Sequence, residues 1–213
     1  MKQLVFAIFF GCAMLLQAQE LLDRVVARVD GQAITLSDAR AAAGFGLVDI
    51  ADGADPIASA TRGLIERQLM LVEVARFSPP EPDSAALDRE AATLRERAGS
   101  GLAALMISTG VNDARVRELA RDSLRIQAYL NQRFGVMVQV TDEEAAQYYR
   151  MHPDEFRRDG QLIPFEEAAS RARERASAER RRTTIDQWVR DLRARADILC
   201  QLDDAACKIV LEQ

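Results

Sequence analysis

The sequence is poor in histidine, cysteine and aromatic residues, and this shortage excludes several common kinds of site. Its 213 residues include one histidine, three cysteines and one tryptophan. Because His152 is the only histidine, we expect no metal site, since zinc-type centres combine several histidine and cysteine ligands. No Ser/His/Asp constellation, nucleophile elbow or glycine-rich phosphate loop is present. We therefore predict no catalytic residue and no cofactor.

Long apolar segments and excess positive charge are also lacking. Beyond the N-terminus no segment approaches the roughly 20 apolar residues that span a bilayer, so we expect no stable membrane insertion. The net charge is −5, which gives no overall attraction to nucleic acid. Nine arginines within residues 171–195 suggest a nucleic-acid surface, but acidic residues interleave with them. Alternating charges are typical of a solvated helix face, and we expect no nucleic-acid partner.

The first 18 residues have the organisation of a secretory signal peptide. Lys2 precedes an apolar run over residues 4–16, and the small residue Ala18 stands before the expected cleavage site. We predict cleavage after Ala18 and a periplasmic location. Two alternatives stay open: an uncleaved anchor, and a lipoprotein suggested by Cys12.

Export agrees with the cysteine content. Loss of Cys12 with the signal peptide leaves Cys200 and Cys207 as an even pair in an oxidising compartment. In one continuous helix, residues seven apart lie ~10 Å from each other, beyond the reach of a disulfide. A bridge therefore requires a break, which residues 201–204 can supply with Asp203 as a helix N-cap. The alternative is two free thiols on a frayed tail.

The remaining chain is predicted to be mainly α-helical with a small antiparallel sheet. Residues 24–29 and 32–36 have strand character, and Asp30-Gly31 between them is a strong hairpin turn. Residues 197–199 are predicted to be a strand that joins this hairpin. We expect one domain after the signal peptide, composed of a helical part over 19–163, a closing helix and strand over 164–199, and a C-terminal tail over 200–213.

Capping residues and breakers divide the rest into helices. Ser37-Asp38 are predicted to cap the first helix, and Thr141 forms a capping box with Glu144. Pro56 stands where a helix often begins. Helices are predicted at residues 39–43, 57–77, 84–98, 102–107, 113–134, 142–149 and 164–196, and a short strand at 136–140. Apolar residues lie nearly all round the helix at 57–77, so we expect it to be central and buried on most sides.

Four segments, in this order, resemble the SurA/PpiC family of periplasmic folding factors. They are Val25 to Thr35, like the family's opening hairpin; Leu64 to Ala75, like its central helix; Leu124 to Phe134 with Val140 to Phe156, like its last helices; and Ile185 to Ile198, like its closing helix and strand. The resemblance covers most of residues 24–198. It implies the fold of the SurA N-terminal chaperone domain.

One departure from the family pattern concerns catalysis. The family usually places a parvulin prolyl-isomerase domain with paired histidines between the last helices and the closing helix. Here only seven residues, Arg157 to Ile163, occupy that place. We therefore expect a chain without the isomerase domain.

The resemblance implies a function in folding. It indicates an ATP-independent holdase that binds unfolded or outer-membrane-bound polypeptides through apolar clefts, with unfolded or partly folded envelope proteins as partners. One alternative is a non-catalytic adaptor that holds a single envelope partner, and a second is a peptidyl-prolyl isomerase, disfavoured because the parvulin domain is missing. A homodimer is a further expectation, because a long closing helix can pack on either protomer.

Client binding needs apolar side chains that are exposed yet held apart. The candidates are Phe45, Leu47, Val48 and Ile50 in the loop at 44–55, and Leu102, Leu105, Met106 and Ile107 on the short helix. The alternative is that these residues close the core. Tyr148 and Tyr149, with Phe156, are predicted to form an aromatic shelf for client peptides or, alternatively, to pack against the closing helix. His152 is either a pH sensor or a solvated residue at a helix end.

Overall fold

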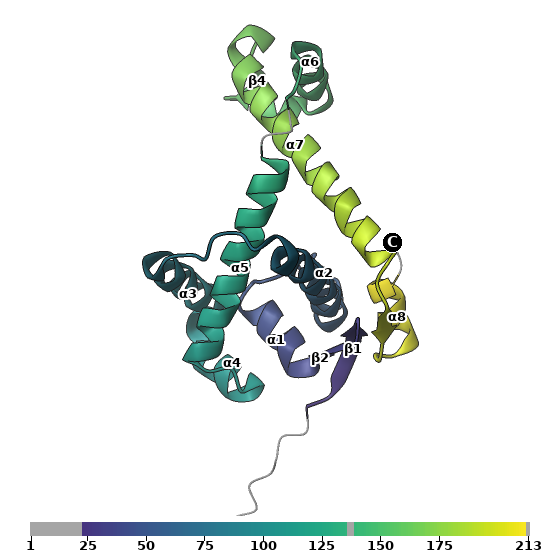
Figure 1. The fold of residues 1–213 in the computed structure, drawn as a ribbon. Coiled ribbons are helices and arrows are strands. Elements are labelled where there is room, and N and C mark those ends of the chain that lie inside the picture. The colour runs from purple at the N-terminus through teal and green to yellow at the C-terminus, as the bar shows by residue number, and fades with distance from the viewer. Residues whose placement is uncertain (1–22, 136–138, 212–213) are drawn as a thin grey trace, which may run out of the picture.

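Helices make up most of the molecule, as predicted, and a small antiparallel sheet joins its two ends (Figure 1). The computed structural model describes residues 23–135 and 139–211. The predicted signal peptide, residues 1–18, lies outside these ranges. Within them, no helix is both long enough and apolar enough to cross a membrane.

The main sheet has three strands in the order β2-β1-β5. Strand β1 (Val25–Val29) pairs antiparallel with β2 (Gln32–Thr35) on one side and with β5 (Ile198–Cys200) on the other. The sheet thus combines the predicted N-terminal hairpin with the predicted C-terminal strand, so segments almost 170 residues apart in sequence lie side by side.

The hairpin turn also holds the C-terminal strand. Asp30 and Gly31 both have positive φ, 48° and 82°, which suits a two-residue turn matched to the twist of the strands. The Asp30 carboxylate Oδ1 accepts a hydrogen bond of 2.9 Å from the Asp197 backbone N–H. The Asp30 N–H donates to the Asp197 carbonyl, also at 2.9 Å. The turn therefore fixes both the β1–β2 register and the start of β5.

The helices begin close to the predicted caps. They are α1 (Leu36–Gly44), α2 (Pro56–Phe77), α3 (Ser84–Ala98), α4 (Leu102–Thr109), α5 (Asp113–Phe134), α6 (Asp142–Met151), α7 (Phe165–Arg193) and α8 (Asp204–Leu211), with 3₁₀ turns η1 (Gly99–Gly101) and η2 (Pro153–Phe156) and a small hairpin of β3 (Arg157–Arg158) and β4 (Gln161–Leu162). The predicted capping box at Thr141 and Glu144 is present.

Two local predictions are wrong. The cap of α1 is Thr35, not Ser37, because Thr35 and Asp38 exchange hydrogen bonds as a capping box. The strand predicted at 136–140 is not formed at Gln139 and Val140, which have no regular structure; residues 136–138 lie outside the described residues.

Two long helices connect a broad body to a distal apex (Figure 1). The body holds the main sheet, α1 to α4 and α8. From it α5 runs to the apex, where α6 and the β3–β4 hairpin lie, and α7 returns diagonally to the body. The first part of α7 packs on α6, and its last part reaches α2 and α5.

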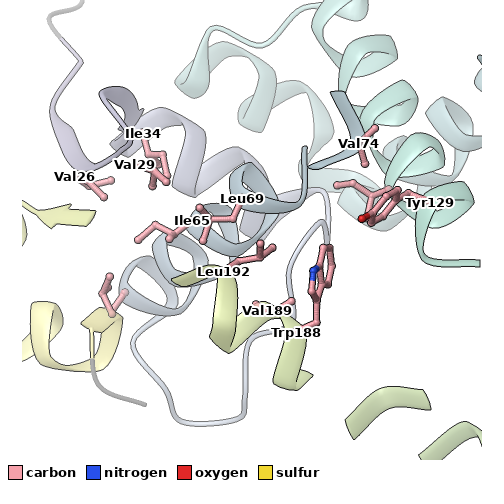
Figure 2. Close-up of a cluster of buried hydrophobic side chains, with 14 of the residues drawn as sticks. Val26, Val29, Ile34, Ile65, Leu69, Val74, Tyr129, Trp188, Val189 and Leu192 are labelled. Carbon is pink, nitrogen blue, oxygen red and sulfur yellow. The ribbon is translucent and has the colours of Figure 1, made fainter. Parts of the chain in front are cut away.

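The main cluster of buried side chains lies where α2, α5, α7 and α8 meet the sheet (Figure 2). It contains Val26, Ala27, Val29, Ile34, Ala58, Ile65, Leu69, Val74, Ile126, Tyr129, Phe134, Trp188, Val189, Leu192, Ala206 and Val210. Trp188 of α7 contacts the rings of Tyr129 and Phe134 on α5, with centroids 5.7 and 5.4 Å away. This aromatic contact fixes the angle at which the two long helices meet.

Two smaller clusters complete the core. The second cluster joins α1, α3 and α5 through Ala41, Phe45, Ala91, Leu94, Val116, Leu119 and Ala120. The apex cluster joins α6, η2 and α7 through Ala145, Phe156, Ile163, Ala168 and Ala172. The body and the apex therefore have separate apolar cores.

The β3–β4 hairpin forms the seven-residue connection, Arg157 to Ile163, between η2 and α7. Asp159 and Gly160 form its turn with φ of 51° and 81°. The Ile163 N–H donates to the Phe156 carbonyl at 2.9 Å, so the hairpin brings the ends of the seven-residue segment together. Because both residues are buried in the apex cluster, the connection between η2 and α7 is closed by packing.

A disulfide joins Cys200 at the end of β5 to Cys207 in α8, with the Cα atoms 5.6 Å apart. The predicted break is present, since the Asp203 carboxylate caps α8 by accepting from the Ala206 N–H at 2.9 Å. Ala206 and Val210 are buried in the main cluster. The segment predicted as a C-terminal tail thus packs in the core of the body.

Candidate functional site

A depression of about 490 Å³ lies in the angle between α5 and α7. We call it the interhelix groove. Its apolar lining consists of Leu47, Leu124, Ile126, Leu130 and Ile185, and its polar lining includes Arg67, Glu90, Arg97, Gln127, Asn131 and Arg181. The loop after α1 and the helices α2 and α3 supply the body side, whereas α7 supplies the opposite side. The groove is therefore mixed in character, with apolar patches between charged groups.

Among the apolar residues that line the groove, Leu124 differs in its packing. Leu130 and Ile185 pack against the main cluster, and Leu47 packs against the second cluster. Leu124 is half-buried and belongs to none of the three clusters. Because its side chain lines the groove and is partly exposed, a bound molecule can contact it.

Behind the α7 side of the groove lies one buried donor. Arg181 Nη2 donates to Asn131 Oδ1 at 2.7 Å, which ties α7 to α5. Arg181 Nε is buried and has no hydrogen-bond acceptor within the described ranges. A buried donor without an acceptor costs about 1–3 kcal/mol. Because this nitrogen has essentially no accessible surface, a bound chain would reach it only if the arginine side chain moved.

Arg67 stands between the groove and a smaller cavity. It projects from α2, and its Nη2 donates to the Leu119 carbonyl at 3.0 Å and to Ser123 Oγ at 2.9 Å, both on α5. The smaller cavity, about 130 Å³, lies between α1, α2 and α5. We call it the Arg67 cavity. Leu47 and Arg67 line both spaces, so the two adjoin.

Burial changes the protonation equilibria of the charged groups in the Arg67 cavity. Desolvation lowers the pKa of Arg67, and the negative charges of Asp122 and Glu90 oppose this effect. Desolvation also raises the pKa of Asp122, although Arg67 and Arg115 act in the other direction. Water is thus partly excluded from both groups, which makes each a stronger partner for a polar ligand.

A further groove of about 390 Å³ runs between α6 and α7 at the apex. Tyr148 and Met151 of α6 line it together with Ala176 and Arg180 of α7. Met151 is 67% exposed, and methionine side chains adapt readily to different apolar partners. This apex groove is a second surface on which a flexible chain can pack.

The predicted client-binding residues of the loop are mostly used internally. Phe45 is completely buried in the second cluster, so the prediction that it is exposed is wrong. Val48 packs on the backbone of Gly63 in α2, where an added Cβ would lie 2.6 Å from a Val48 methyl. Leu47 lines the interhelix groove, and Ile50 is half-buried outside the three clusters.

The predicted binding residues on α4 are also mostly packed against the body. Leu105 packs on Gly44, where an added Cβ would lie 2.6 Å from a Leu105 methyl. Leu102 and Met106 are half-buried against the second cluster. Ile107 alone of the four is strongly exposed, at 82%. Three of the four residues therefore help to hold α4 on the body.

The aromatic residues at the apex mainly follow the alternative interpretation. Phe156 is completely buried, and Tyr149 contacts it while donating its hydroxyl to the Ile163 carbonyl at 2.6 Å. Tyr148 stacks on His152 with ring centroids 4.2 Å apart and donates to Glu155 Oε1 at 2.9 Å. Tyr149 and Phe156 thus pack the junction with α7, while Tyr148 also lines the apex groove.

The arginines of α7 are largely engaged in ion pairs with acidic residues. Arg173 and Arg180 pair with Asp142 and Glu144 at the start of α6, and Arg193 lies 3.3 Å from a Glu66 carboxylate oxygen on α2. These ion pairs hold α7 against α6 at the apex and against α2 in the body. Across residues 23–135 and 139–211, no group of three histidine, cysteine, aspartate or glutamate side chains is placed to hold a metal ion.

Sequence patterns alone did not single out Arg67, Asp122 and Leu124 as a site. Arg67 lies within three consecutive polar residues, Glu66 to Gln68, between Ile65 and Leu69, so the sequence pattern does not distinguish it. Leu124 falls within the predicted helix at 113–134, and its position beside a groove follows only from the angle at which α7 crosses.

No protein-family model matches the chain, and no curated protein matches it either. Membership of the SurA/PpiC family therefore stays a prediction from the four segments described above.

Proposed function

We propose that the chain is an ATP-independent, periplasmic holdase-type chaperone that binds unfolded or outer-membrane-bound polypeptides. The observation that carries this proposal is the interhelix groove between α5 and α7, with Leu124 available for contact. Support also comes from the signal-like first 18 residues and the resemblance to the SurA N-terminal domain. The clients are unfolded or partly folded envelope proteins.

The groove suits reversible binding to many different chains. Burying one leucine-sized side chain contributes about 1.5–3 kcal/mol, and ordering a flexible chain consumes part of that. Each groove alone therefore binds weakly, and a client that reaches both the interhelix groove and the apex groove gains avidity. Removal of Lys2 with the signal peptide would change the net charge from −5 to −6, which favours solubility of the loaded chaperone.

Suppression of aggregation tests this function. The full-length protein is expressed with its own N-terminal segment, purified, and mixed without ATP with a chemically denatured model protein. We expect aggregation to fall at near-stoichiometric ratio. Leu124→Gln should weaken the suppression several-fold, whereas Leu87→Gln on α3, also half-buried outside the clusters, should not. Absence of suppression at a large excess of the protein would contradict a general holdase.

A second candidate is a non-catalytic adaptor that holds one envelope partner. It is favoured by exposed apolar residues on β5 and α8, namely Leu199, Ile209 and Leu211. An adaptor would retain one protein from an envelope extract and leave denatured model proteins to aggregate. Prolyl isomerisation is the least supported activity, because a closed hairpin occupies the place of the parvulin domain. A prolyl-peptide assay should therefore give no rate above background.

A further inference from the structure

The Arg67 cavity has the size of one medium apolar side chain. Its volume is about 130 Å³, close to the ~150 Å³ of an apolar cavity that holds one benzene molecule. A branched aliphatic side chain such as that of leucine has fewer heavy atoms than benzene and fits this space. An indole ring is larger than benzene and does not.

Apolar and polar side chains both line the cavity. Ala42 of α1, Leu64 and Leu71 of α2, and Leu119 of α5 form its walls. Ala42 is buried and its side chain borders the cavity. A larger side chain at position 42 would occupy the cavity.

The polar side chains that line the cavity are those of Asp38, Arg67, Gln68, Arg115 and Asp122. Asp38 is engaged in the capping box of α1 and Arg115 pairs with Glu118, so we consider Arg67 as the donor and Asp122 as the acceptor for a ligand. Both hydrogen bonds of Arg67 use Nη2, and a guanidinium carries further N–H groups on Nε and Nη1. The Asp122 carboxylate also lines the cavity. It accepts no hydrogen bond from the rest of the described chain, and interacts with Arg67 electrostatically. Arg67 and Asp122 can therefore serve a ligand that needs both a donor and an acceptor.

A peptide unit has this pair of requirements, because its carbonyl accepts and its N–H donates. A free carboxylate only accepts, so it would leave the Asp122 carboxylate without a donor. The cavity also adjoins the interhelix groove through Leu47 and Arg67, so a chain anchored in the cavity can continue along the groove. An extended polypeptide therefore fits better than an isolated small acid.

We propose that the Arg67 cavity takes one branched aliphatic side chain of an unfolded client, while Arg67 and Asp122 hydrogen-bond the adjoining peptide unit. This inference rests on the proposed function and adds to it a preference for client segments that contain a branched aliphatic residue. The rest of the client lies in the interhelix groove.

Short peptides test the preference directly with the full chain. Three peptides, acetylated at the N-terminus and amidated at the C-terminus, differ only in a central leucine, alanine or tryptophan. A fourth ends in leucine with a free carboxylate. We expect the leucine peptide to bind about tenfold more tightly than the alanine peptide, from the extra apolar area buried. The tryptophan peptide and the free-carboxylate peptide should both bind more weakly than the leucine peptide.

Two variants and one control test whether the leucine peptide binds in the Arg67 cavity. Ala42→Leu should fill the cavity and remove the difference between the leucine and alanine peptides. Ala92→Leu adds the same atoms on the exposed side of α3 and should leave the difference unchanged. Asp122→Ala should weaken binding of the leucine peptide several-fold by removing the acceptor; it serves as the second test should Ala42→Leu not fold.

The outcomes separate this inference from the proposed function. Equal binding of the leucine and alanine peptides by a protein that still suppresses aggregation would overturn the cavity proposal and leave the holdase. Leucine preference without suppression of aggregation would support the cavity and overturn the holdase. Tighter binding of the free carboxylate would overturn recognition of the peptide unit.

Discussion

Two glycines determine how Val48 and Leu105 pack. Val48 covers the bare backbone of Gly63, and Leu105 covers that of Gly44. In both places a side chain on the glycine would overlap a methyl group, since a 2.6 Å contact is far below ordinary carbon separation. Whether an apolar side chain is exposed or buried thus depends on which part of the fold packs against it. The residue type alone does not show this.

The carboxylate of Asp122 gives a prediction at the scale of one residue. Burial raises its pKa above the ordinary value of 3.8, so its charged form opposes folding. That penalty is complete above the folded-state pKa, and it disappears as the pH falls through that pKa towards 3.8. We therefore expect Asp122→Asn to increase the free energy of unfolding at pH 7 and to have little effect near pH 3.8.

Urea denaturation of the wild type and the variant across this pH range measures the difference. Burial also raises the pKa of Glu66, so only the difference between the two proteins isolates Asp122. A variant that is less stable than the wild type at pH 7 would show that the attraction to Arg67 outweighs the desolvation of the carboxylate.

At the scale of elements, the caps and turns agree well with local patterns. Asp55, Asp83 and Asn112 each accept a hydrogen bond from the first turn of a helix, as short polar side chains do at N-caps. The one misplaced start, at α1, has the same cause, because Thr35 and Asp38 fit a capping box better than Ser37 fits a simple cap.

The disulfide between β5 and α8 gives the prediction for elements. Cys200 and Cys207 are separated by 7 positions, and closing a loop of this size stabilises a fold by about 2–3 kcal/mol in the chain-entropy model. Reduction should lower the free energy of unfolding by this amount. It should also increase hydrogen exchange in α8, whose Val210 carbonyl accepts a hydrogen bond of 2.6 Å from Arg193 Nη2.

A double variant, Cys200→Ser with Cys207→Ser, provides the control for the reductant. It should resemble the reduced wild type and should not respond to reduction. Unchanged stability and unchanged exchange in α8 after reduction would mean that packing of Ala206 and Val210 in the main cluster is sufficient to hold the helix.

At the scale of the whole molecule, the body and the apex have different cores joined by α5 and α7 (Figure 1). Such units can open separately, with free energies below that of global unfolding. Trp188, the only tryptophan, lies in the main cluster of the body. Its fluorescence therefore reports on the body and is insensitive to the apex.

Removal of the largest buried side chain at the apex should open the apex alone. Phe156→Ala is expected to cost about 3–5 kcal/mol in the apex cluster. Hydrogen exchange should then increase in α6 and the first turns of α7, while Trp188 emission and protection of β1 remain native. A blue- or red-shifted Trp188 emission under native conditions would instead show that the body and the apex fold as one unit.

Most of the architecture could be predicted, whereas most of the candidate site could not. Strand alternation, the Asp30-Gly31 turn and the capping residues all act within a few positions, so patterns were sufficient to find the hairpin and the helices. The groove depends on the crossing of α5 and α7 at Trp188 and on the Arg181–Asn131 contact. Of the proposed binding residues, Leu47 was predicted, whereas Leu124 was not.

Local chemistry was thus enough to specify the elements, the break between Cys200 and Cys207, and a connection too short for a further domain, because each depends on neighbouring residues. Tertiary packing alone decided that Phe45 is buried, that Leu124 and Arg67 border open space, and that the C-terminal helix belongs to the main core. The physical reason is that exposure depends on which distant segment lies opposite a side chain. That arrangement is set by the sum of all apolar contacts rather than by any short stretch of the chain.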